Sequence, residues 1–422
     1  MTVPSRPVPP PSRVTVVGTG LAGLRTLAEL RAQGFTGTLT AVGAETQAPY
    51  DRPPLSKELF SRPEPVWLAD EGYGDLSALA DEVLLGHRAV ALDADDDGAR
   101  LTVAGPEDTR EIVSDVVVLA TGAGALTPGG WRDVATLHDL ADAARLRAQL
   151  RPGVRLAVIG AGWIGAELAS VAAGQGVDVT VLEGGPVPLG HVLGPEVGRL
   201  TVPWYRELGI DLRCGVSVTN AEAGVVTLAD GGRVEADVVV AAVGVRPHTS
   251  WLSGALPLTP RGAVPVDLVG RVDGGPASVR AVGDCADRFS PRDGLVPGAH
   301  WDGALNHPAA LVADLLGGPD APPDPAPYVF STQLGRELTV VGHVPPGAEV
   351  LLRGEPGAGP WTALYVTRDT EGHPRLRAGF TVDRPRDVGP LRKALSRAEH
   401  PLIDVTAAAD PGVQLRKTLA QT

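Results

Sequence analysis

Two glycine-rich turns of the same design lie far apart in this chain and constrain its fold more than any other feature. The first is Gly18-Thr19-Gly20-Leu21-Ala22-Gly23, directly after the apolar run 14–17, and the second is Gly160-Ala161-Gly162-Trp163-Ile164-Gly165, directly after the apolar run 156–159. Stretches of helical character follow at 24–33 and 166–173. In this strand–turn–helix context the glycines let a pyrophosphate approach the helix N-terminus, although one such motif alone is weak evidence. Two copies predict two bound dinucleotides and favour an enzyme that moves a hydride between a nicotinamide and a flavin.

The repeat extends beyond the glycines. An apolar run from Asp115 ends in Ala120-Thr121-Gly122, and a matching run from Asp237 ends in Ala242-Val243-Gly244. Both runs are typical of buried parallel strands that end in a glycine turn. A purely structural role for both turns is therefore the less favoured alternative, and we expect two Rossmann-like halves.

A chain of 422 residues is too long for one hydrophobic core and predicts about three domains. The predicted fold class is α/β, with two Rossmann-like dinucleotide-binding domains, one for FAD and one for NAD, and a small C-terminal α/β domain. The predicted organisation is a disordered tail at 1–12, FAD-binding segments at 13–125 and 249–318, an NAD-binding domain at 126–248, a linker at 319–327 and the C-terminal domain at 328–422.

Composition excludes several classes of function. A net charge of −13 argues against nucleic acid as a partner. The mean hydropathy is +0.06, and no long apolar segment or secretory signal is present, so we expect a cytoplasmic protein without membrane contact. Cys214 and Cys285 are the only cysteines, and no C-x-x-C pair exists. We therefore predict neither a redox-active cysteine pair beside the flavin nor a metal site.

A carboxylate at the end of the second strand of each half indicates which dinucleotide binds there. Glu183 follows the apolar run 179–182, about twenty residues after the second glycine turn, where it can hydrogen-bond the ribose hydroxyls of NADH and repel the 2′-phosphate of NADPH. Glu45 occupies the comparable place in the first half and suits the adenosine ribose of FAD. We therefore predict FAD and NADH as the two cofactors.

The segment Pro49-Tyr50-Asp51-Arg52-Pro53-Pro54-Leu55-Ser56-Lys57-Glu58-Leu59 resembles the flavin-binding segment of the oxygenase-coupled, NADH-dependent ferredoxin and rubredoxin reductases. These enzymes belong to the pyridine nucleotide-disulfide oxidoreductase superfamily but lack its redox cysteines, and apoptosis-inducing-factor-like proteins share the segment. The resemblance covers nearly the whole chain. It includes both glycine turns, Ala120-Thr121-Gly122, Gly244-Val245-Arg246-Pro247, Val282-Gly283-Asp284-Cys285-Ala286 and Arg384-Pro385-Arg386-Asp387.

The resemblance also implies roles for individual residues. Asp284 is expected to hold the ribityl chain of FAD, Gly283 to bind FAD beside it, and Arg52 and Lys57 to lie along the flavin. Glu167 is expected to pair with Lys57, which would stabilise negative charge on the reduced flavin. These two are the predicted catalytic residues; a surface salt bridge of little consequence is the alternative. For Trp163, a lid over the flavin and simple packing stay open.

The departures from the family cluster on one side of the predicted flavin site. Trp301 and an Ala are retained at the late flavin helix, in the stretch 299–308, but the acid, the Asn and the Gln-Gly pair that the family usually carries there are not found at their family positions. Phe330 replaces a Trp at the head of the C-terminal domain, in Phe330-Ser331-Thr332-Gln333. The residues predicted to bind NADH and receive its hydride are intact. Either this is drift within a ferredoxin reductase or the electron acceptor has changed.

Three functions follow from these observations. The favoured one passes electrons from NADH through FAD to an acidic 2Fe–2S ferredoxin of an oxygenase system, with the chain as a monomer or a homodimer. A basic patch of Arg384, Arg386, Arg392 and Lys393 could receive such a carrier. The alternative is a flavoenzyme on the same scaffold that acts directly on a small molecule or a quinone. A redox-regulated binding protein of the apoptosis-factor type ranks last.

Overall fold

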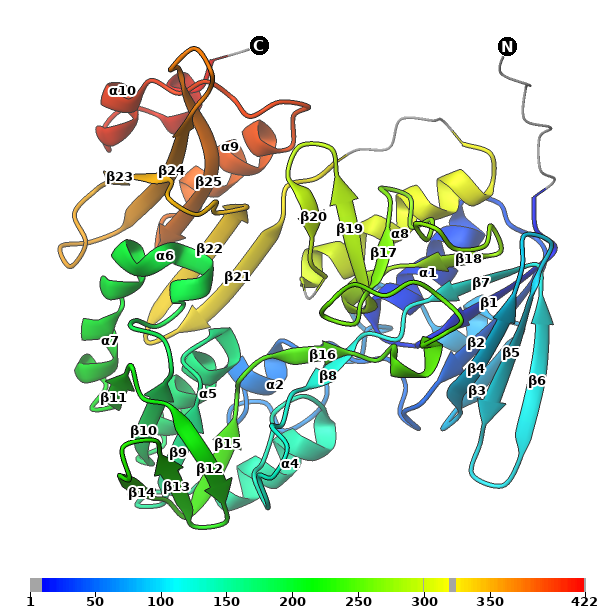
Figure 1. Ribbon diagram of the computed structural model, residues 1–422, viewed down its shortest axis with the longest axis horizontal. Helices are drawn as coiled ribbons and strands as arrows, with labels where there is room; N and C mark the ends of the chain where they lie inside the picture. Colours follow the sequence, from blue (N-terminus) through cyan, green and yellow to red (C-terminus); the bar gives the residue numbers. More distant parts are fainter. Residues whose placement is uncertain (1–9, 299, 319–323, 421–422) are drawn as a thin grey trace. The chain divides into compact units, whose positions relative to one another are not determined.

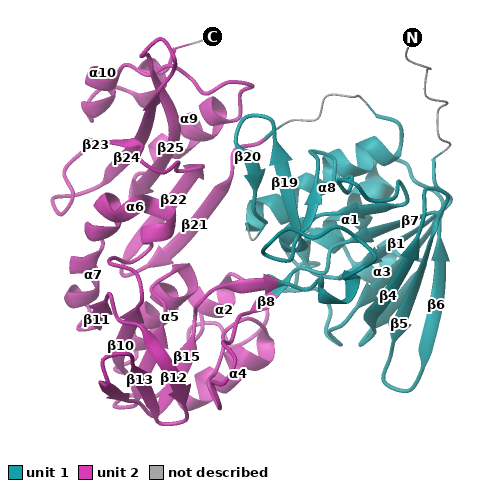
Figure 2. Ribbon diagram, in the orientation of Figure 1, with its two compact units in different colours: residues 1–51, 66–123, 247–324 teal, residues 52–65, 124–246, 325–422 magenta. Residues whose placement is uncertain are grey.

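A computed structural model describes residues 10–298, 300–318 and 324–420 (Figure 1). Most of the predicted tail at 1–12 and part of the predicted linker at 319–327 therefore lie outside the described residues. The chain forms two compact units, and Figure 2 colours them separately. Unit 1 contains residues 1–51, 66–123 and 247–324, and unit 2 contains residues 52–65, 124–246 and 325–422. The paired strands β8 (Ala123–Ala125) and β16 (Val245–Pro247) contain two of the points where the chain passes from one unit to the other.

Unit 1 is built on a five-stranded parallel sheet with the order β18-β7-β1-β2-β3. Its strands are β1 (Arg13–Val17), β2 (Thr38–Gly43), β3 (Glu82–Leu85), β7 (Val116–Leu119) and β18 (Val279–Ala281). The inner strands are continuous apolar runs because both faces of a parallel sheet are covered. The late strand β18 pairs with β7, so the segment after 247 completes the first sheet.

The two faces of this sheet are covered differently. On one face, α1 (Leu21–Ala32) and α8 (Trp301–Leu315) bury Leu24, Leu27 and Leu311 against alternate residues of the strands. On the other face lies a three-stranded antiparallel sheet of β4 (Arg88–Ala94), β5 (Ala99–Ala104) and β6 (Thr109–Ser114). Smaller elements of unit 1 are α3 (Leu76–Leu79), η1 (Ser250–Leu252), η2 (Gly283–Cys285), β17 (Val264–Val266), β19 (Ala286–Ser290) and β20 (Gly294–Val296).

Unit 2 begins with a second parallel sheet, of the order β11-β10-β9-β15. Its strands are β9 (Arg155–Ile159), β10 (Asp178–Glu183), β11 (Asp211–Cys214) and β15 (Val238–Ala241). The helices of this half are α2 (Pro54–Lys57), α4 (Leu140–Gln149), α5 (Trp163–Gly174), α6 (Gly190–Arg199) and α7 (Val202–Glu207). An antiparallel sheet of β12 (Val218–Glu222), β13 (Val225–Leu228) and β14 (Arg233–Glu235) covers the remaining face.

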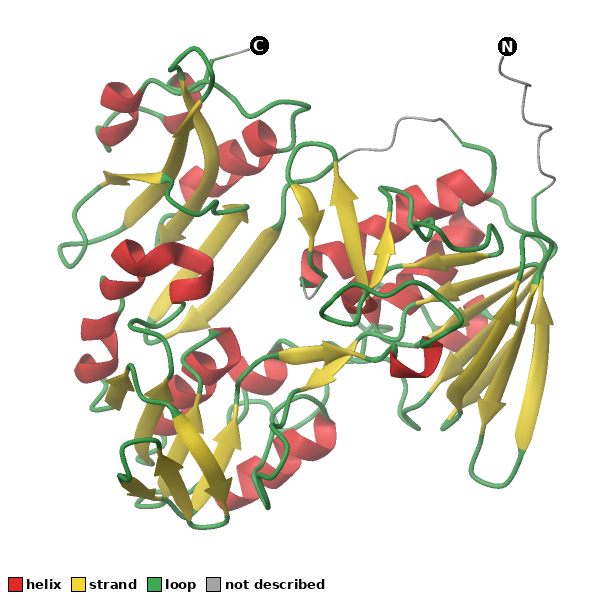
Figure 3. Cartoon of the chain, in the orientation of Figure 1, coloured by secondary structure: helices red, strands yellow, loops and turns green. Residues whose placement is uncertain are grey.

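The C-terminal part of unit 2 is a five-stranded antiparallel sheet with the order β21-β22-β25-β24-β23 (Figure 3). Its strands are β21 (Tyr328–Gln333), β22 (Arg336–Gly342), β23 (Glu349–Arg353), β24 (Trp361–Arg368) and β25 (Pro374–Val382), followed by α9 (Pro385–Leu395), α10 (Val405–Ala409) and η3 (Leu415–Lys417). This part packs on the second Rossmann half. The Leu334 N–H donates to Ser170 Oγ at 2.9 Å, and the Tyr365 hydroxyl donates to the Leu193 carbonyl at 2.8 Å.

The predicted α/β fold class, with two Rossmann-like halves and a small C-terminal α/β part, is confirmed. None of the helices in the described ranges has the length and apolar character needed to cross a membrane.

Candidate active site

The first glycine turn needs glycine at two positions, Gly18 and Gly23. Gly18 has a φ of +110°, and a Cβ there would collide with the Ala120 carbonyl oxygen. A Cβ on Gly23 would collide with the Gly18 carbonyl in the same way. The turn at the end of β1, the first residues of α1 and the end of β7 therefore pack at backbone contact. This explains why Gly18, Gly23 and the Ala120-Thr121-Gly122 segment are needed together.

The side of this turn that faces outward is open. A Cβ on Gly20 would meet nothing within 4 Å. Gly20 is also the N-cap of α1, where no side chain caps the helix and no acid lies in the first turn. The first backbone N–H groups of a helix lack partners within it, and the helix dipole favours an anion there. This backbone cradle fits the pyrophosphate of a dinucleotide.

The second glycine turn repeats this geometry in unit 2. Gly160 has a φ of +105°, and a Cβ there would collide with the Ala242 carbonyl oxygen. Gly162 is open on its outer side and caps α5, again without a capping side chain or an early acid. Trp163 is half-buried and Ile164 is exposed in the first turn of α5. The structure therefore contains a second cradle that fits the pyrophosphate of a dinucleotide.

Other predicted FAD residues lie around the first cradle in unit 1. Gly283, which follows β18, lies against Ala22 of α1, because a Cβ on Gly283 would come within 2.8 Å of the Ala22 Cβ. Asp284 is the next residue and is half-buried. The structure thus brings the predicted ribityl-binding segment to the first turn of α1.

Three side-chain contacts in unit 1 involve predicted flavin residues. The Tyr50 hydroxyl donates to Glu45 Oε2 at 2.7 Å. The Trp301 indole N–H, at the start of α8, donates to Asp51 Oδ1 at 2.8 Å, and the ring of Tyr73 meets Trp301 edge-on at a centroid distance of 6.3 Å. In the segment 49–59, Tyr50 thus orients the carboxylate of Glu45, and Asp51 orients the indole ring of Trp301.

Glu183 lies beside the second cradle. It ends β10, and its carboxylate accepts the Ala161 N–H at 2.7 Å and the Gly185 N–H at 2.6 Å. These bonds fix a negative charge at the glycine turn, where a 2′-phosphate would be repelled. The role of Glu183 in choosing the dinucleotide stays a prediction.

Lys57 and Glu167 are in direct contact in unit 2. Lys57 Nζ, at the end of α2, lies 2.8 Å from Glu167 Oε1 in α5. The Glu167 side chain is only 4% exposed, and that of Lys57 is 17% exposed. Lys57 Nζ also lies 5.4 Å from the centroid of the Phe330 ring on β21. This pair is therefore largely desolvated rather than a surface salt bridge, so the Lys57 charge has a fixed place.

Two hydroxyls that the sequence reasoning missed complete this contact. The Ser56 hydroxyl donates to Glu167 Oε2 at 2.5 Å, and the Ser331 hydroxyl donates to Glu167 Oε1 at 2.5 Å. Ser56 directly precedes Lys57, and Ser331 directly follows Phe330 in segments already singled out. Their adjacency to predicted site residues is the signal that could have found them.

The predicted flavin residues are divided between the two units. The first glycine turn, Glu45, Asp284 and Trp301 belong to unit 1, while Arg52, Lys57 and Phe330 belong to unit 2. Within unit 2, an Arg52 guanidinium N–H donates to the His138 carbonyl at 2.6 Å, just before α4.

The two cysteines are both free thiols. Burial raises the pKa of Cys285, and burial together with the Glu183 carboxylate raises the pKa of Cys214. A raised pKa leaves little thiolate at neutral pH, so neither thiol is activated as a nucleophile.

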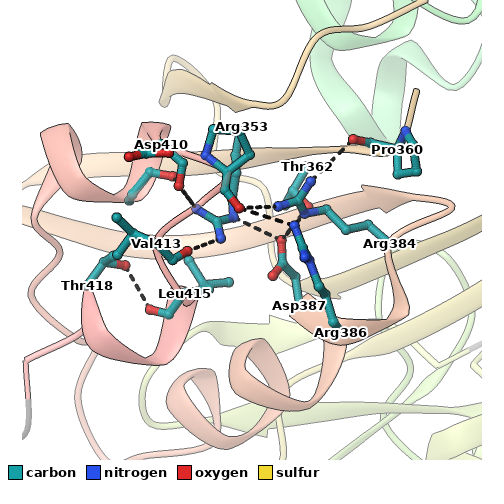
Figure 4. A network of polar contacts seen from close by, with 12 residues as sticks. Arg353, Pro360, Thr362, Arg384, Arg386, Asp387, Asp410, Val413, Leu415 and Thr418 are labelled. Atoms are coloured by element: carbon teal, nitrogen blue, oxygen red, sulfur yellow. Dashed lines mark hydrogen bonds and ion pairs between the residues drawn. The ribbon is translucent and has the colours of Figure 1, made fainter. Parts of the chain in front are cut away.

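The structure corrects one part of the predicted basic patch. Arg384 is buried, and its guanidinium donates to Asp387 Oδ2 at 2.7 Å and to the Pro360 and Pro411 carbonyls (Figure 4). Arg384 therefore holds the C-terminal part together and cannot contribute to a docking surface. Arg386, Arg392 and Lys393 are exposed.

Comparison with known proteins places this fold and site in a family. The family model described as pyridine nucleotide-disulphide oxidoreductase matches residues 12–303, and the model described as reductase C-terminal matches residues 328–419. The chain therefore belongs to the pyridine nucleotide-disulphide oxidoreductase family and carries a reductase-type C-terminal domain. The predicted family resemblance is confirmed.

Particular relatives extend over almost the whole chain. The chain is 32% identical to the anthranilate 1,2-dioxygenase system ferredoxin–NAD(+) reductase component of Burkholderia cepacia, covering 96% of this chain and 98% of the relative. Its fold matches the ferredoxin reductase for the CYP199A2 system from Rhodopseudomonas palustris with a TM-score of 0.86 at 28% identity, covering 97% of this chain and 100% of the other. It also matches the covalent putidaredoxin reductase–putidaredoxin complex with a TM-score of 0.82 at 27% identity, covering 96% of this chain and 98% of the other.

Proposed function

We propose that this protein is an FAD-dependent NADH oxidoreductase that passes electrons to a small 2Fe–2S ferredoxin serving an oxygenase. The observation that carries the proposal is the desolvated Lys57–Glu167 contact, 2.8 Å long, in the same unit as the second phosphate cradle. The two open cradles at Gly20 and Gly162 supply one dinucleotide site each. The names of the relatives support the choice of ferredoxin as the acceptor.

Each cofactor is assigned its own set of residues. FAD is held by Gly18, Gly20, Leu21, Ala22, Gly23, Glu45, Arg52, Lys57, Ala120, Thr121, Gly122, Gly283, Asp284, Trp301 and Phe330. NADH is held by Gly160, Gly162, Trp163, Ile164, Gly165, Glu183, Val243 and Gly244. Bound FAD supplies the ability to take two electrons as a hydride and release them one at a time.

The protein's own contribution is electrostatic and positional. Lys57 presents an ammonium whose place is set by Glu167, and this charge stabilises the negative charge that hydride transfer creates. Glu183 orients the adenosine ribose of NADH through its fixed carboxylate. Trp163, half-buried in the first turn of α5, is assigned as a lid over the flavin until NADH arrives, with simple packing as the alternative.

The electron carrier is assigned by charge. A 2Fe–2S ferredoxin is commonly acidic, whereas this chain has a net charge of −13, so docking needs a local basic surface. The exposed residues Arg386, Arg392 and Lys393 of α9 provide one in the C-terminal part. We place the protein in the cytoplasm, where NADH is available.

The proposed function predicts a yellow protein with about one FAD per chain that NADH bleaches under anaerobic conditions. The reduced protein is then presented in turn with a 2Fe–2S ferredoxin, a quinone and oxygen, and the recovery of flavin absorbance is timed. We expect the ferredoxin to restore the colour fastest. Fastest recovery with the quinone would favour the direct small-molecule alternative, and a protein that cannot bind FAD would refute the whole mechanism.

The fixed carboxylate of Glu183 predicts that kcat/KM is at least roughly tenfold higher with NADH than with NADPH. Placing a phosphate dianion against a carboxylate should cost more than about 1.4 kcal/mol, which corresponds to a factor of ten. Steady-state rates with the two dinucleotides at equal ionic strength test this expectation. Equal efficiencies would show that Glu183 does not face the adenosine ribose.

A further inference from the structure

The buried carboxylate of Glu167 accepts two hydrogen bonds from hydroxyl groups in addition to its ion pair with Lys57. Besides Lys57 Nζ, it accepts the Ser56 hydroxyl on Oε2 and the Ser331 hydroxyl on Oε1, each at 2.5 Å. Glu167 is 3% exposed, so water does not satisfy these oxygens. A buried charge of this kind is costly unless donors are arranged around it. Three elements, α2, α5 and β21, meet at this one carboxylate.

The direction of each hydroxyl bond is fixed by its neighbours. A serine hydroxyl has a single proton to donate. The Gln333 side-chain amide, which is buried, donates to Ser331 Oγ at 2.9 Å and therefore leaves the Ser331 proton for Glu167. The other acceptor near Ser56 Oγ is the Pro53 carbonyl at 3.4 Å, much farther than Glu167 Oε2. Each carboxylate oxygen thus has one hydroxyl donor.

These two donors fix the rotation of the carboxylate. The last torsion of a glutamate side chain is broad, so a carboxylate with one partner can turn freely. With a hydroxyl on each oxygen, Oε1 is held toward Lys57 Nζ, which lies 5.4 Å from the Phe330 ring centroid. We propose that Ser331 and Ser56, with Gln333 behind Ser331, are positioning residues that fix the Lys57 charge for hydride transfer. This inference rests on the proposed function for its purpose, but its geometry can be tested separately.

The lysine content of the chain allows a direct test. Lys57, Lys393 and Lys417 are the only lysines, and the latter two are exposed. The FAD-loaded protein is labelled with trace acetic anhydride at neutral pH, and the labelling of each lysine is measured by mass spectrometry. Ser331→Ala removes one hydroxyl that holds the Glu167 carboxylate, so Lys57 should be released from its ion pair with Glu167 more often and react more often with the anhydride. We expect Lys57 labelling relative to Lys393 to rise about fivefold, equivalent to the ~1 kcal/mol of one hydrogen bond. Ser56→Ala should act in the same direction, and Glu167→Gln should give the largest rise.

Thr332 provides a matched control on the same strand. Its side chain is exposed, and its hydroxyl donates to Glu337 at 3.0 Å rather than to Glu167. Thr332→Ala should leave Lys57 labelling at the wild-type level, and Ser331→Thr should restore that level because it restores the hydroxyl. Unchanged Lys57 labelling in both Ser331→Ala and Ser56→Ala would overturn the proposal. So would a rise in Ser331→Thr equal to that in Ser331→Ala.

A kinetic readout separates positioning from general damage. In single-turnover mixing with NADH, Ser331→Ala should slow flavin bleaching about fivefold, matching the labelling, while the concentration of NADH at half-maximal rate stays unchanged. A changed NADH affinity with an unchanged limiting rate would contradict the positioning role. The labelling needs neither NADH nor ferredoxin. A wild-type protein that NADH does not bleach would therefore refute the proposed function, while the labelling would still decide whether the hydroxyls hold Lys57.

Discussion

Lys57→Met is expected to slow the bleaching of the flavin by NADH by 10- to 1000-fold, on the order of 1.4–4 kcal/mol of transition-state stabilisation. Lys57 Nζ lies 2.8 Å from a Glu167 carboxylate that is almost fully buried, so its charge does not have to be reoriented during the reaction. A preorganised ammonium stabilises developing negative charge most strongly in the transition state and product. Glu167→Gln should slow bleaching in the same direction, because it removes the partner that places Lys57. Stopped-flow absorbance under anaerobic conditions measures the effect.

Lys393→Met is the matched control for this experiment. Lys393 is exposed on α9, so its removal changes the net charge by the same amount without touching Glu167, and bleaching should keep its wild-type rate. Trp301→Phe, in unit 1, should also leave bleaching nearly intact and alter mainly re-oxidation by the acceptor. Phe330 is a less clean probe because its ring lies 5.4 Å from Lys57 Nζ. If Lys57→Met bleached as fast as wild type while Trp301→Phe did not, Lys57 would not be the residue that supports hydride transfer.

The parts of the fold and site that could be predicted from sequence depend on local rules. Gly18 and Gly160 have φ values of +110° and +105°, which few residues other than glycine adopt. The glycines required there therefore allow both turns to be predicted from the sequence. The runs that form β1, β7, β9 and β15 are continuous and apolar because parallel strands are buried on both faces. The Lys57–Glu167 pairing came from the family resemblance, since 110 positions separate the two residues.

The antiparallel sheet of β4, β5 and β6 could not be predicted from its sequence pattern in the same way. A half-buried strand should alternate apolar and polar residues, but the pairing of β4 with β5 shifts register between Ala89 and Ala91, which breaks the alternation. Strand β6 has a mostly exposed surface and carries almost no apolar pattern. The alternation of apolar and polar residues was therefore too weak to predict strands in this region.

Ser331 was not predicted as a site residue because its contact depends on the topology of the chain. Ser331 and Glu167 are 164 positions apart, and their contact exists only because β21 of the C-terminal sheet packs on α5 of the second Rossmann half. Arg384 was mispredicted because its burial depends on distant segments. Asp387 is only three positions away, but the Pro360 and Pro411 carbonyls that also accept from the Arg384 guanidinium are 24 and 27 positions away.

Asp387→Asn is expected to destabilise the C-terminal part of the protein by about 3–5 kcal/mol, the usual cost of removing one partner of a buried ion pair. Asp387 Oδ2 accepts from Arg384 Nε at 2.7 Å, from Arg353 Nε at 3.1 Å and from the Thr362 hydroxyl at 3.0 Å (Figure 4). Arg353 is 1% exposed, so the variant would leave two buried guanidinium groups without their counter-charge.

The loss should appear first in the segment that Arg353 holds. Its guanidinium also donates to the Ala408, Asp410 and Val413 carbonyls, which belong to the segment after residue 404. We expect Asp387→Asn to unfold at lower urea concentration and to become sensitive to proteolysis near the C-terminus.

Glu349 and Arg368 provide the control, because this pair lies in the same sheet but both side chains are more than half exposed. Glu349→Gln should cost less than about 1 kcal/mol, because exposed ion pairs are screened by water. Equal urea midpoints for Asp387→Asn and Glu349→Gln would contradict the role assigned to Asp387. At low temperature, where the Asp387→Asn protein stays folded, its flavin should still bleach at close to the wild-type rate, because Asp387 contacts neither Lys57 nor Glu167. The charge cluster around Asp387 therefore stabilises the C-terminal sheet, while Ser331 on β21 links that sheet to the proposed reaction site.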